Sequence, residues 1–484
     1  MAKVQIPHPV YTLSLPYRPQ TRSHAAAKKA TLRIRFVIVG GGAAGLACAV
    51  ALRRVGHQVI VLEKDLNFVG SSKRRGIRMP PNMTKIFNYW GMSGDVDDIG
   101  TPVDRLIISR LENAYLLGIH QWEYELVQEA GGEFTAVSHY RLRKLLLEAA
   151  VELGAVIRTN AEVVEIAADC RSLRLASGEV IQADVIIGAD GNRGLCRKLL
   201  CPNDPPNGTG VMLFDSVIPG DSIRADPELS SLLQREQVSQ WAWFGHERAS
   251  LCCPIGPSQD LDLAFHFYAI DDGATEGWDD ILSPEQFAPY LSGTEPRIQK
   301  LGRLARPTRV RMMERTFPEE WVHETGRLVI VGSAAHPFPP AVMYGPSMSL
   351  EDASVLAKLF SHLGREEQIR SFLYAFQNLR EGRCQSNRAL DIGNIKFMMV
   401  PTGEMTEMRD KMMRARYDQG RNVLEDGTVA QWDRNRELFG YDAEDEADNW
   451  WVQWGLLQER ARAAHLENGV RLDLFALDVN MRIA

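Results

Sequence analysis

The chain of 484 residues contains no pair of cysteines in CxxC spacing. Its 7 cysteines are scattered and odd in number, and the adjacent pair Cys252 and Cys253 suits neither a redox dithiol nor a zinc site. This distribution predicts a reduced intracellular protein, without a disulfide framework and without a bound metal.

Long apolar runs and excess positive charge are also missing. No stretch of about 18 apolar residues occurs, so a membrane-spanning helix is not expected. The formal net charge of −7 argues against nucleic acid as the main partner, because phosphate binding requires concentrated Lys and Arg. The hydrophobic content of 45% and the charged content of 24% are those of a globular protein, and the length allows a large core.

No acidic residue precedes Glu63, whereas residues 1–35 contain several Lys and Arg. This composition weakly resembles an organelle-transit peptide. Prolines between residues 7 and 19 would interrupt an amphipathic helix there. We therefore expect residues 1–32 to form a surface extension of a cytoplasmic protein rather than a transit peptide.

A glycine-rich turn separates a predicted strand from a predicted helix. Residues 33–39 end in the apolar run of a buried parallel strand, and residues 43–55 have the Ala- and Leu-rich composition of a helix. Residues 58–62 read as a second buried strand. This order predicts a βαβ unit of the nucleotide-binding kind.

The turn itself fits the GxGxxG pattern. Gly40 permits the tight turn, Gly42 lets the backbone approach a pyrophosphate, and Gly45 allows close helix–strand packing. The pyrophosphate would lie at the helix N-terminus, beside Ala43 and Ala44, where free N–H groups favour anions. Glu63 follows about 20 residues on, at the position that recognises a ribose. The pattern predicts a bound dinucleotide, but by itself it does not separate FAD from NAD.

The rest of the chain predicts a split α/β domain. Residues 185–187 and 327–331 return to the buried-strand pattern, and residues 347–363 read as a helix. Between them, alternating segments such as 240–244 and 261–270 predict an open sheet with one covered face. The predicted organisation is an N-terminal extension (1–32), a Rossmann-like FAD-binding domain in two parts (33–201 and 326–400), an inserted substrate-binding β-sheet domain (202–325) and a helical C-terminal region (401–484).

Two later segments narrow the dinucleotide to FAD. Residues 188–197 (GADGNRGLCR) and 332–352 (GSAAHPFPPAVMYGPSMSLED) resemble, in order and spacing, the two flavin motifs of the group A FAD-dependent aromatic monooxygenases. This is the family of the p-hydroxybenzoate and salicylate hydroxylases, and the likeness is closest to its fungal branch. It extends to residues 76–82, to the domain order and to Arg409-Asp410.

The resemblance implies a role for several residues. Asp190 and Gly191 would lie where FAD and a transient NAD(P)H both reach, and Pro340 would lie beside the flavin ring. Gly345, with Pro346 at the first helical position, would start a helix whose N-terminus stabilises the negative charge of reduced flavin. The expected cofactor-binding residues are Gly40, Gly42, Ala43, Ala44, Gly45, Glu63, Lys64, Arg78, His139, Arg141, Asp190, Gly191, Ser333, Pro340, Gly345, Ser347 and Met348.

The chain departs from the family pattern at several positions. Ser333 replaces an Asp that binds the ribityl chain, so a charge-assisted hydrogen bond is lost there. Gly194 stands where Ser is usual, and Tyr344 where Gln is common. The position of an expected flavin-binding Arg is His139, with Arg141 two residues later.

Candidate catalytic residues lie in the predicted sheet domain and at the flavin. His266 and Tyr268 would share one face of an alternating strand and could orient or deprotonate a phenol. His246 and Pro340 complete this set, although His and Tyr in a sheet are more often structural. The residues Trp241-Ala242-Trp243 partly match a flavin halogenase motif, but alternating aromatics on one strand face explain them more simply.

The resemblance implies an NAD(P)H- and O₂-dependent hydroxylation of an aromatic or conjugated small molecule, with or without decarboxylation. In this family NAD(P)H reduces FAD, O₂ adds to flavin C4a, and the hydroperoxide transfers OH. Only one GxGxxG occurs, so NADPH or NADH would visit rather than reside. Two alternatives stay open: an FAD-dependent epoxidase, oxidase or cyclisation catalyst of secondary metabolism, and a degenerate flavin-binding protein, which Ser333 motivates. A monomer or a homodimer is expected.

Overall fold

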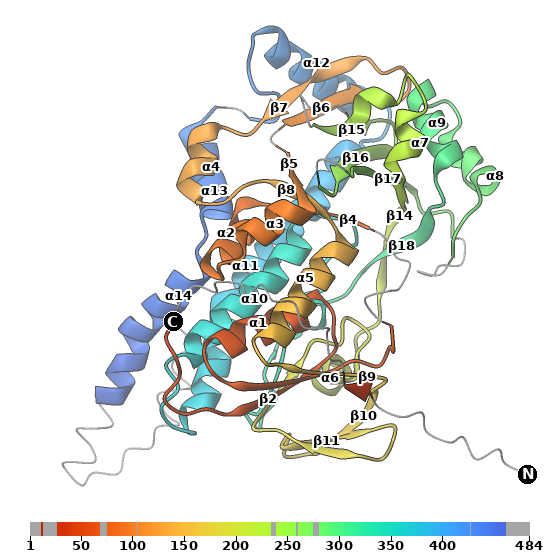
Figure 1. Ribbon diagram of the computed structural model, residues 1–484. Helices are drawn as coiled ribbons and strands as arrows, with labels where there is room; N and C mark the ends of the chain where they lie inside the picture. Colours follow the sequence, from red (N-terminus) through yellow and green to blue (C-terminus); the bar gives the residue numbers. More distant parts are fainter. Residues whose placement is uncertain are drawn as a thin grey trace, which may run out of the picture.

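A six-stranded sheet forms the lower half of the computed structural model, with the strand order β1-β9-β3-β2-β13-β19 (Figure 1). All its neighbouring strands are parallel, except that β1 is antiparallel to β9. Its strands are β1 (Tyr11–Thr12), β2 (Arg35–Val39), β3 (Gln58–Leu62), β9 (Val156–Thr159), β13 (Val185–Gly188) and β19 (Leu328–Ile330). The structure describes residues 11–12, 27–67, 75–103, 105–233, 239–257, 260–273, 280–425 and 427–460.

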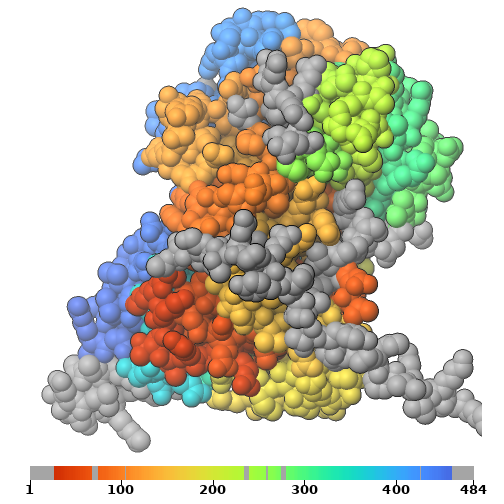
Figure 2. Space-filling view, in the orientation of Figure 1, coloured from red at the N-terminus to blue at the C-terminus, as the bar shows by residue number. Residues whose placement is uncertain are grey.

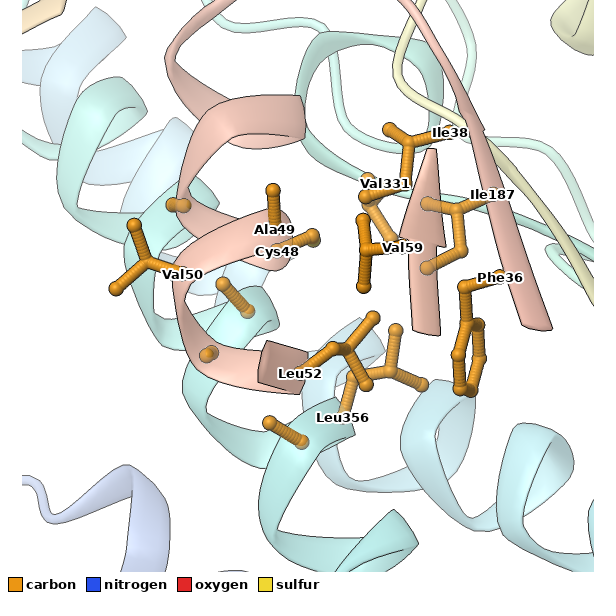
Figure 3. Packing of buried hydrophobic residues seen from close by; sticks show 14 of the residues in the cluster. Phe36, Ile38, Cys48, Ala49, Val50, Leu52, Val59, Ile187, Val331 and Leu356 are labelled. Carbon is orange, nitrogen blue, oxygen red and sulfur yellow. The ribbon is translucent and has the colours of Figure 1, made fainter. Parts of the chain in front are cut away.

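Three helices pack around this sheet: α1 (Ala43–Arg54), α5 (His139–Glu152) and α10 (Tyr344–Phe360). Apolar side chains of β2 and of its neighbours β3 and β13 meet α1 and α10 in one core, where Phe36, Leu52 and Leu356 are fully buried (Figure 3). Each such side chain stabilises the fold by about 1.5–3 kcal/mol relative to its exposed form. The parallel strands and α1 confirm the predicted βαβ unit. Gly56, with a φ of 98°, follows the end of α1 and leads into β3.

The helix predicted at 347–363 begins earlier, at Tyr344, and ends at Phe360. Gly345 and Pro346 therefore lie inside its first turn, and the prediction that Pro346 is the first helical residue is wrong. A proline is tolerated there because the first N–H groups of a helix have no intrahelical acceptor.

A second sheet of seven strands forms the upper half of the molecule, in the order β18-β14-β17-β16-β15-β6-β7 (Figure 1). Its strands are β6 (Arg105–Arg110), β7 (Leu116–Gln121), β14 (Asn207–Ile218), β15 (Gln240–Phe244), β16 (Ala249–Ile255), β17 (Asp262–Ile270) and β18 (Thr308–Glu314). The strands β6 and β7 come from the range assigned to the first part of the FAD-binding domain. The predicted domain boundaries do not show that β6 and β7 belong to this sheet. The reason is that β6 pairs with β15, which lies far along the chain.

The prediction that this sheet has only one covered face is wrong. Phe265 and Phe267 pack on one side against α8 (Pro284–Phe287) and α9 (Pro296–Leu304). Tyr268 lies in a separate apolar cluster on the opposite side. Both faces of β17 are buried because the FAD-binding part and the C-terminal helices cover the second face.

Two small antiparallel sheets complete the strand inventory of the described residues. One consists of β4 (Gly76–Met79), β8 (Thr135–Ser138) and β5 (Gly100–Pro102), and the other of β10 (Val163–Ile166), β11 (Ser172–Leu175) and β12 (Val180–Gln182). Further α-helices before the C-terminal region are α2 (Pro81–Tyr89), α3 (Ser93–Ile99), α4 (Tyr124–Ala130), α6 (Leu195–Leu200), α7 (Gly220–Arg224) and α11 (Gln368–Met398).

The C-terminal region is helical as predicted, with α12 (Glu404–Asp418), α13 (Val429–Phe439) and α14 (Ala443–Trp450). Helix α12 packs on β7, so the blue and orange segments lie side by side at the top of Figure 2. The buried Asp410 carboxylate of α12 also joins this helix to β6, because it accepts hydrogen bonds from Arg110 of β6 and from Arg409.

None of the helices in the described ranges is both long and apolar enough to span a bilayer. Most of the predicted N-terminal extension (residues 1–10 and 13–26) and the end of the C-terminal region (461–484) lie outside the described residues.

Candidate active site

Three motif segments meet at the carboxyl ends of β2, β13 and β19. The first is the glycine turn (40–45), the second is 188–197 and the third is 332–352. A Cβ added to Gly40 would lie 2.4 Å from the carbonyl oxygen of Ala189, in the second segment. A Cβ added to Gly332 would lie 2.6 Å from Cβ of Ala44, so the third segment packs on the start of α1. The fold thus brings together residues that the sequence separates widely, at the edge where α/β sheets bind their ligands.

The glycine turn leaves the N-terminus of α1 open. Its N-cap residue, Gly42, has no side chain to cap the helix, and a Cβ added there would meet no atom within 4 Å. Glu63 links the glycine turn to the end of β3. Its two carboxylate oxygens accept hydrogen bonds from the backbone N–H groups of Gly41 (2.8 Å) and Asp65 (2.9 Å). An open helix N-terminus of this shape fits the pyrophosphate of FAD.

Gly42→Ala separates the pyrophosphate role from a purely structural one. The added methyl group has space in the protein, so we expect an unchanged melting temperature for the flavin-free variant. FAD affinity should fall, because the methyl group occupies the approach to the helix N-terminus. Thermal unfolding of the apoprotein and titration with FAD measure the two effects. An unchanged FAD affinity would show that the pyrophosphate lies elsewhere.

Asp190 presents a carboxylate oxygen with no partner among the described residues. Its Oδ2 accepts a hydrogen bond from the N–H of Cys196 (2.9 Å), whereas the buried Oδ1 accepts none. Burial raises the pKa of this carboxyl. A hydroxyl donor of the cofactor would satisfy Oδ1, which supports the expected contact with FAD.

The same carboxylate explains one departure from the family pattern. A Cβ added to Gly194 would lie 2.2 Å from Oδ1 of Asp190, so a serine cannot stand there without moving the carboxylate. Gly191 has a φ of 82°, a conformation that favours glycine.

The basic residues near the turn are arranged differently from the expectation. Arg141 points away from it and pairs with Asp260 (2.8 Å) across a surface pocket. Arg143, one helical turn after His139, lies 3.4 Å from the carbonyl oxygen of Gly41 and interacts with the charge of Glu63. Burial and the charges of two neighbouring arginines lower the pKa of His139 to about 3, so this imidazole is neutral.

The remaining cofactor candidates divide into exposed and buried side chains. Lys64 and Ser333 are exposed, so both can reach a ligand from the protein surface. Ser347 donates to the carbonyl of Tyr344 (2.8 Å), and the sulfur of Met348 accepts from Asn387 (3.5 Å). The side chains of these two residues therefore point into the protein rather than toward a ligand.

A buried ionic network lies behind the third segment. Asp352 accepts hydrogen bonds from the N–H of Gly332 (2.9 Å), from Nε2 of His336 (2.5 Å) and from Nε of Arg380 (2.9 Å). Arg380 also pairs with Glu351 (2.6 Å). Although His336, Asp352 and Cys384 cluster as metal ligands would, the Arg380 guanidinium already supplies the positive charge. The network therefore anchors the flavin-motif loop to α10 and α11.

The pH dependence of stability should reveal the charge of His336. Burial, the largest single cause, would lower its pKa, but the Asp352 carboxylate and Cys384 together outweigh burial and raise the pKa from 6.5 to about 10. A histidine with a raised folded-state pKa contributes stability that is complete below pH 6.5 and is lost as the pH rises through 10. The stability gap between the wild type and His336→Gln should therefore shrink over this range in urea unfolding. A constant gap would show that the imidazole is neutral.

A cavity of about 470 Å³ lies between the seven-stranded sheet and residues 341–344 of the third segment. This volume lies within the range of small-molecule sites, which are mainly apolar with a few placed polar groups. The polar groups at its flavin-motif end include Arg78, Tyr268 and Asp391. Its apolar walls include Leu106, Phe134, Ala242, Leu251 and Val342.

The predicted catalytic residues are not gathered in one place. Tyr268 lines the cavity, and Pro340 directly precedes its wall residue Ala341. His266 is on the same strand face but is buried beside Asp215, 3.5 Å from its carboxylate, and burial lowers its pKa to about 3. His246 lies in an exposed turn outside the cavity and accepts a hydrogen bond from the N–H of Thr402 (2.6 Å).

Trp241 and Trp243 share one strand face, as alternation predicts. Their ring centroids are 6.4 Å apart, and Arg297 of α9 lies over both rings. This face is the one away from the cavity, into which Ala242 points. The two indoles therefore serve the packing of α9, and the halogenase interpretation has no geometric support.

Three residues of the site escaped the sequence-based prediction: Arg143, His120 and Asp391. The spacing from His139 could have indicated Arg143, because residues four apart share a helix face. His120 and Asp391 line the cavity from β7 and α11, and no local pattern marks either of them.

Comparison with known proteins agrees with this geometry. The family model of the FAD binding domain matches residues 33–388. The FAD-dependent monooxygenase OpS4 of Beauveria bassiana (strain ARSEF 2860) is 25% identical over 429 residues, which cover 86% of this chain and 97% of the relative. The 6-hydroxynicotinate 3-monooxygenase of Pseudomonas fluorescens is 25% identical over 360 residues, covering 73% of this chain and 89% of the relative.

Solved structures share the fold. CtdE in complex with FAD and a substrate superposes with a TM-score of 0.72 at 19% identity, covering 88% of this chain and 100% of that chain. A salicylate hydroxylase substrate complex superposes with a TM-score of 0.67 at 18% identity, covering 86% and 97%. The chain therefore belongs to the FAD binding domain family, within the FAD-dependent monooxygenases.

Proposed function

We propose that this protein uses FAD, NAD(P)H and O₂ to hydroxylate an aromatic or similarly conjugated small molecule in the cavity beside residues 341–344. The observation that carries the proposal is the cavity itself, with apolar walls and polar groups at the end next to the flavin-motif loop. Relatives named 3-hydroxybenzoate 6-hydroxylase and 6-hydroxynicotinate 3-monooxygenase act, by those names, on aromatic rings.

The chain supplies binding, orientation and shielding from water. Open N–H groups at α1 and the unpartnered oxygen of Asp190 would hold the cofactor, while Leu251 and Val342 would exclude water from the substrate ring. Bound FAD supplies the redox chemistry with O₂. NADH or NADPH would be a transient visitor, because a single GxGxxG turn is present.

The test uses purified, FAD-loaded protein with a panel of phenols and aromatic acids. We expect one class of ring to stimulate NAD(P)H oxidation and to yield a product heavier by one oxygen atom. Release of CO₂ in step with that product would identify a decarboxylating hydroxylation. Hydrogen peroxide formed without NAD(P)H, together with a substrate that has lost two hydrogen atoms, would indicate an oxidase. Failure to bind FAD would support a degenerate binding protein.

A pair of variants at Ala242 locates the reaction in this cavity. Ala242 is buried on the cavity wall, so Ala242→Phe fills the substrate space, whereas Ala242→Ser leaves it open. Stimulated NAD(P)H oxidation should be lost in the first variant and kept in the second, with flavin content unchanged in both. Equal stimulation in both variants would place the substrate elsewhere.

A further inference from the structure

Residues from four distant segments of the chain form a polar cluster at one end of the cavity. The carbonyl oxygen of Ala341 accepts hydrogen bonds from Nη2 of Arg78 (3.2 Å) and from the hydroxyl of Tyr268 (3.3 Å). The Asp391 carboxylate accepts from the N–H of Tyr344 (3.0 Å) and from the N–H of Met343 (3.3 Å). All of these residues line the cavity.

The cluster holds the loop in a conformation that it would not adopt alone. Ala341 has a φ of 59°, the left-handed region that residues with a Cβ seldom occupy. Its carbonyl oxygen is thereby directed to Arg78 and Tyr268. Strained backbone of this kind persists where surrounding contacts fix it, and it concentrates at functional sites. The polar end of the cavity is therefore preorganised.

Asp391 has acceptor capacity that the protein does not use. An ionised carboxylate offers about four acceptor positions. Two of them take the backbone N–H groups of Met343 and Tyr344, and only 4% of Asp391 is exposed. The Tyr268 hydroxyl donates its proton to Ala341, which leaves Asp391 as the strongest acceptor in this cluster for a donor from the ligand.

The charged groups around Asp391 favour a ligand with a neutral hydroxyl over a ligand with a carboxylate. Burial raises the pKa of Asp391 to about 7, opposed by its two backbone hydrogen bonds and by the Arg78 guanidinium. The hydroxyls of Tyr344 and Tyr268, which also face Asp391, have their pKa values raised by burial and by the Asp391 charge. A substrate carboxylate would add a second negative charge beside Asp391, whereas a neutral hydroxyl would not.

We propose that Asp391 accepts the hydrogen bond of a substrate hydroxyl, so that the cavity selects a phenol or an enol and turns that hydroxyl toward residues 341–344. The inference rests on the proposed function, because it names the substrate class of the same site. If the proton moves, the substrate O–H bond breaks and a carboxyl O–H bond forms, with the electron pair kept on the phenolic oxygen beside Arg78. That oxygen then donates electron density to the ring, which favours attack by an electrophilic oxygen.

Binding without turnover tests this assignment. The probes are 2-naphthol, its methyl ether 2-methoxynaphthalene, and 2-naphthoate, measured by calorimetry on FAD-loaded protein without NAD(P)H. Wild type should bind the naphthol about tenfold more tightly than the ether, as expected for a hydrogen bond to a charged acceptor. The naphthoate should bind more weakly than the naphthol. A wild type without these preferences overturns the proposal by itself.

The variant Asp391→Asn should lose the preference for naphthol over the ether and should bind naphthoate more tightly than wild type does. Binding of the ether reports that its cavity is intact. The matched control is Asp215→Asn, which alters another fully buried carboxyl with a raised pKa that lies outside the cavity lining. The control should keep the wild-type selectivity, and a preference retained in Asp391→Asn would refute the proposal.

This outcome is separable from that of the proposed function. Protein that shows the predicted selectivity but consumes no NAD(P)H with any phenol would refute the hydroxylase assignment alone. Protein that hydroxylates a ring without this selectivity would refute the role of Asp391 alone.

Discussion

Replacing Arg380 with leucine should destabilise the protein by about 3–5 kcal/mol, the cost of breaking a buried ion pair by removing one partner. Arg380 is fully buried between α10 and α11, where it pairs with Glu351 (2.6 Å) and Asp352 (2.9 Å). Its loss leaves two carboxylates with one cation fewer in an interior that water does not reach. Urea unfolding followed by tryptophan fluorescence measures the change in the free energy of unfolding.

The matched control for Arg380→Leu is Arg174→Leu. Arg174 pairs with Glu165 at 2.5 Å, but about half of each side chain is exposed (51% and 56%). Surface pairs of this kind contribute about 0–1 kcal/mol, so the control should unfold almost as the wild type does. Similar losses in the two variants would contradict the anchoring role of the buried network. If Arg380→Leu also bound FAD more weakly, this would show that the network fixes the loop at Gly332 in the conformation that binds the cofactor.

Replacing Gly40 with alanine should weaken FAD binding by at least about tenfold, since the left-handed backbone alone costs roughly 1–2 kcal/mol for a residue with a Cβ. Gly40 has a φ of 107°, and the added Cβ would lie 2.4 Å from the carbonyl oxygen of Ala189. Neither backbone segment can yield, because both belong to the parallel sheet and its turns. Flavin absorbance of the purified protein and titration of apoprotein with FAD give the occupancy and the affinity.

Gly178→Ala isolates the clash from the backbone strain. Gly178 has a φ of 89°, yet a Cβ added there would meet no atom within 4 Å, and it lies in the turn before β12. This variant should lose about 1 kcal/mol of stability and none of its FAD affinity. If Gly40→Ala bound FAD as tightly as Gly178→Ala, the glycine turn would not be the cofactor site.

The nucleotide-binding half of the fold follows from patterns that are local in the sequence. A buried parallel strand, a glycine turn and an Ala-rich helix occupy residues 35–54, and each is specified by neighbours within a few positions. The resemblance at 188–197 and 332–352 then supplied the cofactor and the order of the domains. The ends of the helices were predicted less accurately, because the first turn of a helix lacks the hydrogen bonds that define it. Helix α10, for example, begins at Tyr344 rather than at residue 347.

The sheet domain was only partly predictable. Alternation identified β15 and β17, but the second covered face of β17 and the pairing of β6 with β15 depend on segments far away in the chain. Among the catalytic candidates, alternation correctly placed His266 and Tyr268 on one face. It could not show that the cavity reaches Tyr268, while His266 is enclosed beside Asp215.

The sequence by itself determined the class of the protein, an FAD-binding α/β fold with a further sheet, and the position of the glycine turn at which we expect the cofactor. Only the tertiary structure decided which side chains line the cavity. Arg78 and Ala341 are 263 positions apart, and Asp391 reaches the same loop from a third segment. Such a cluster has no local period, because each member is placed by the packing of its own helix or strand. The chemistry of the polar end therefore becomes visible only after folding.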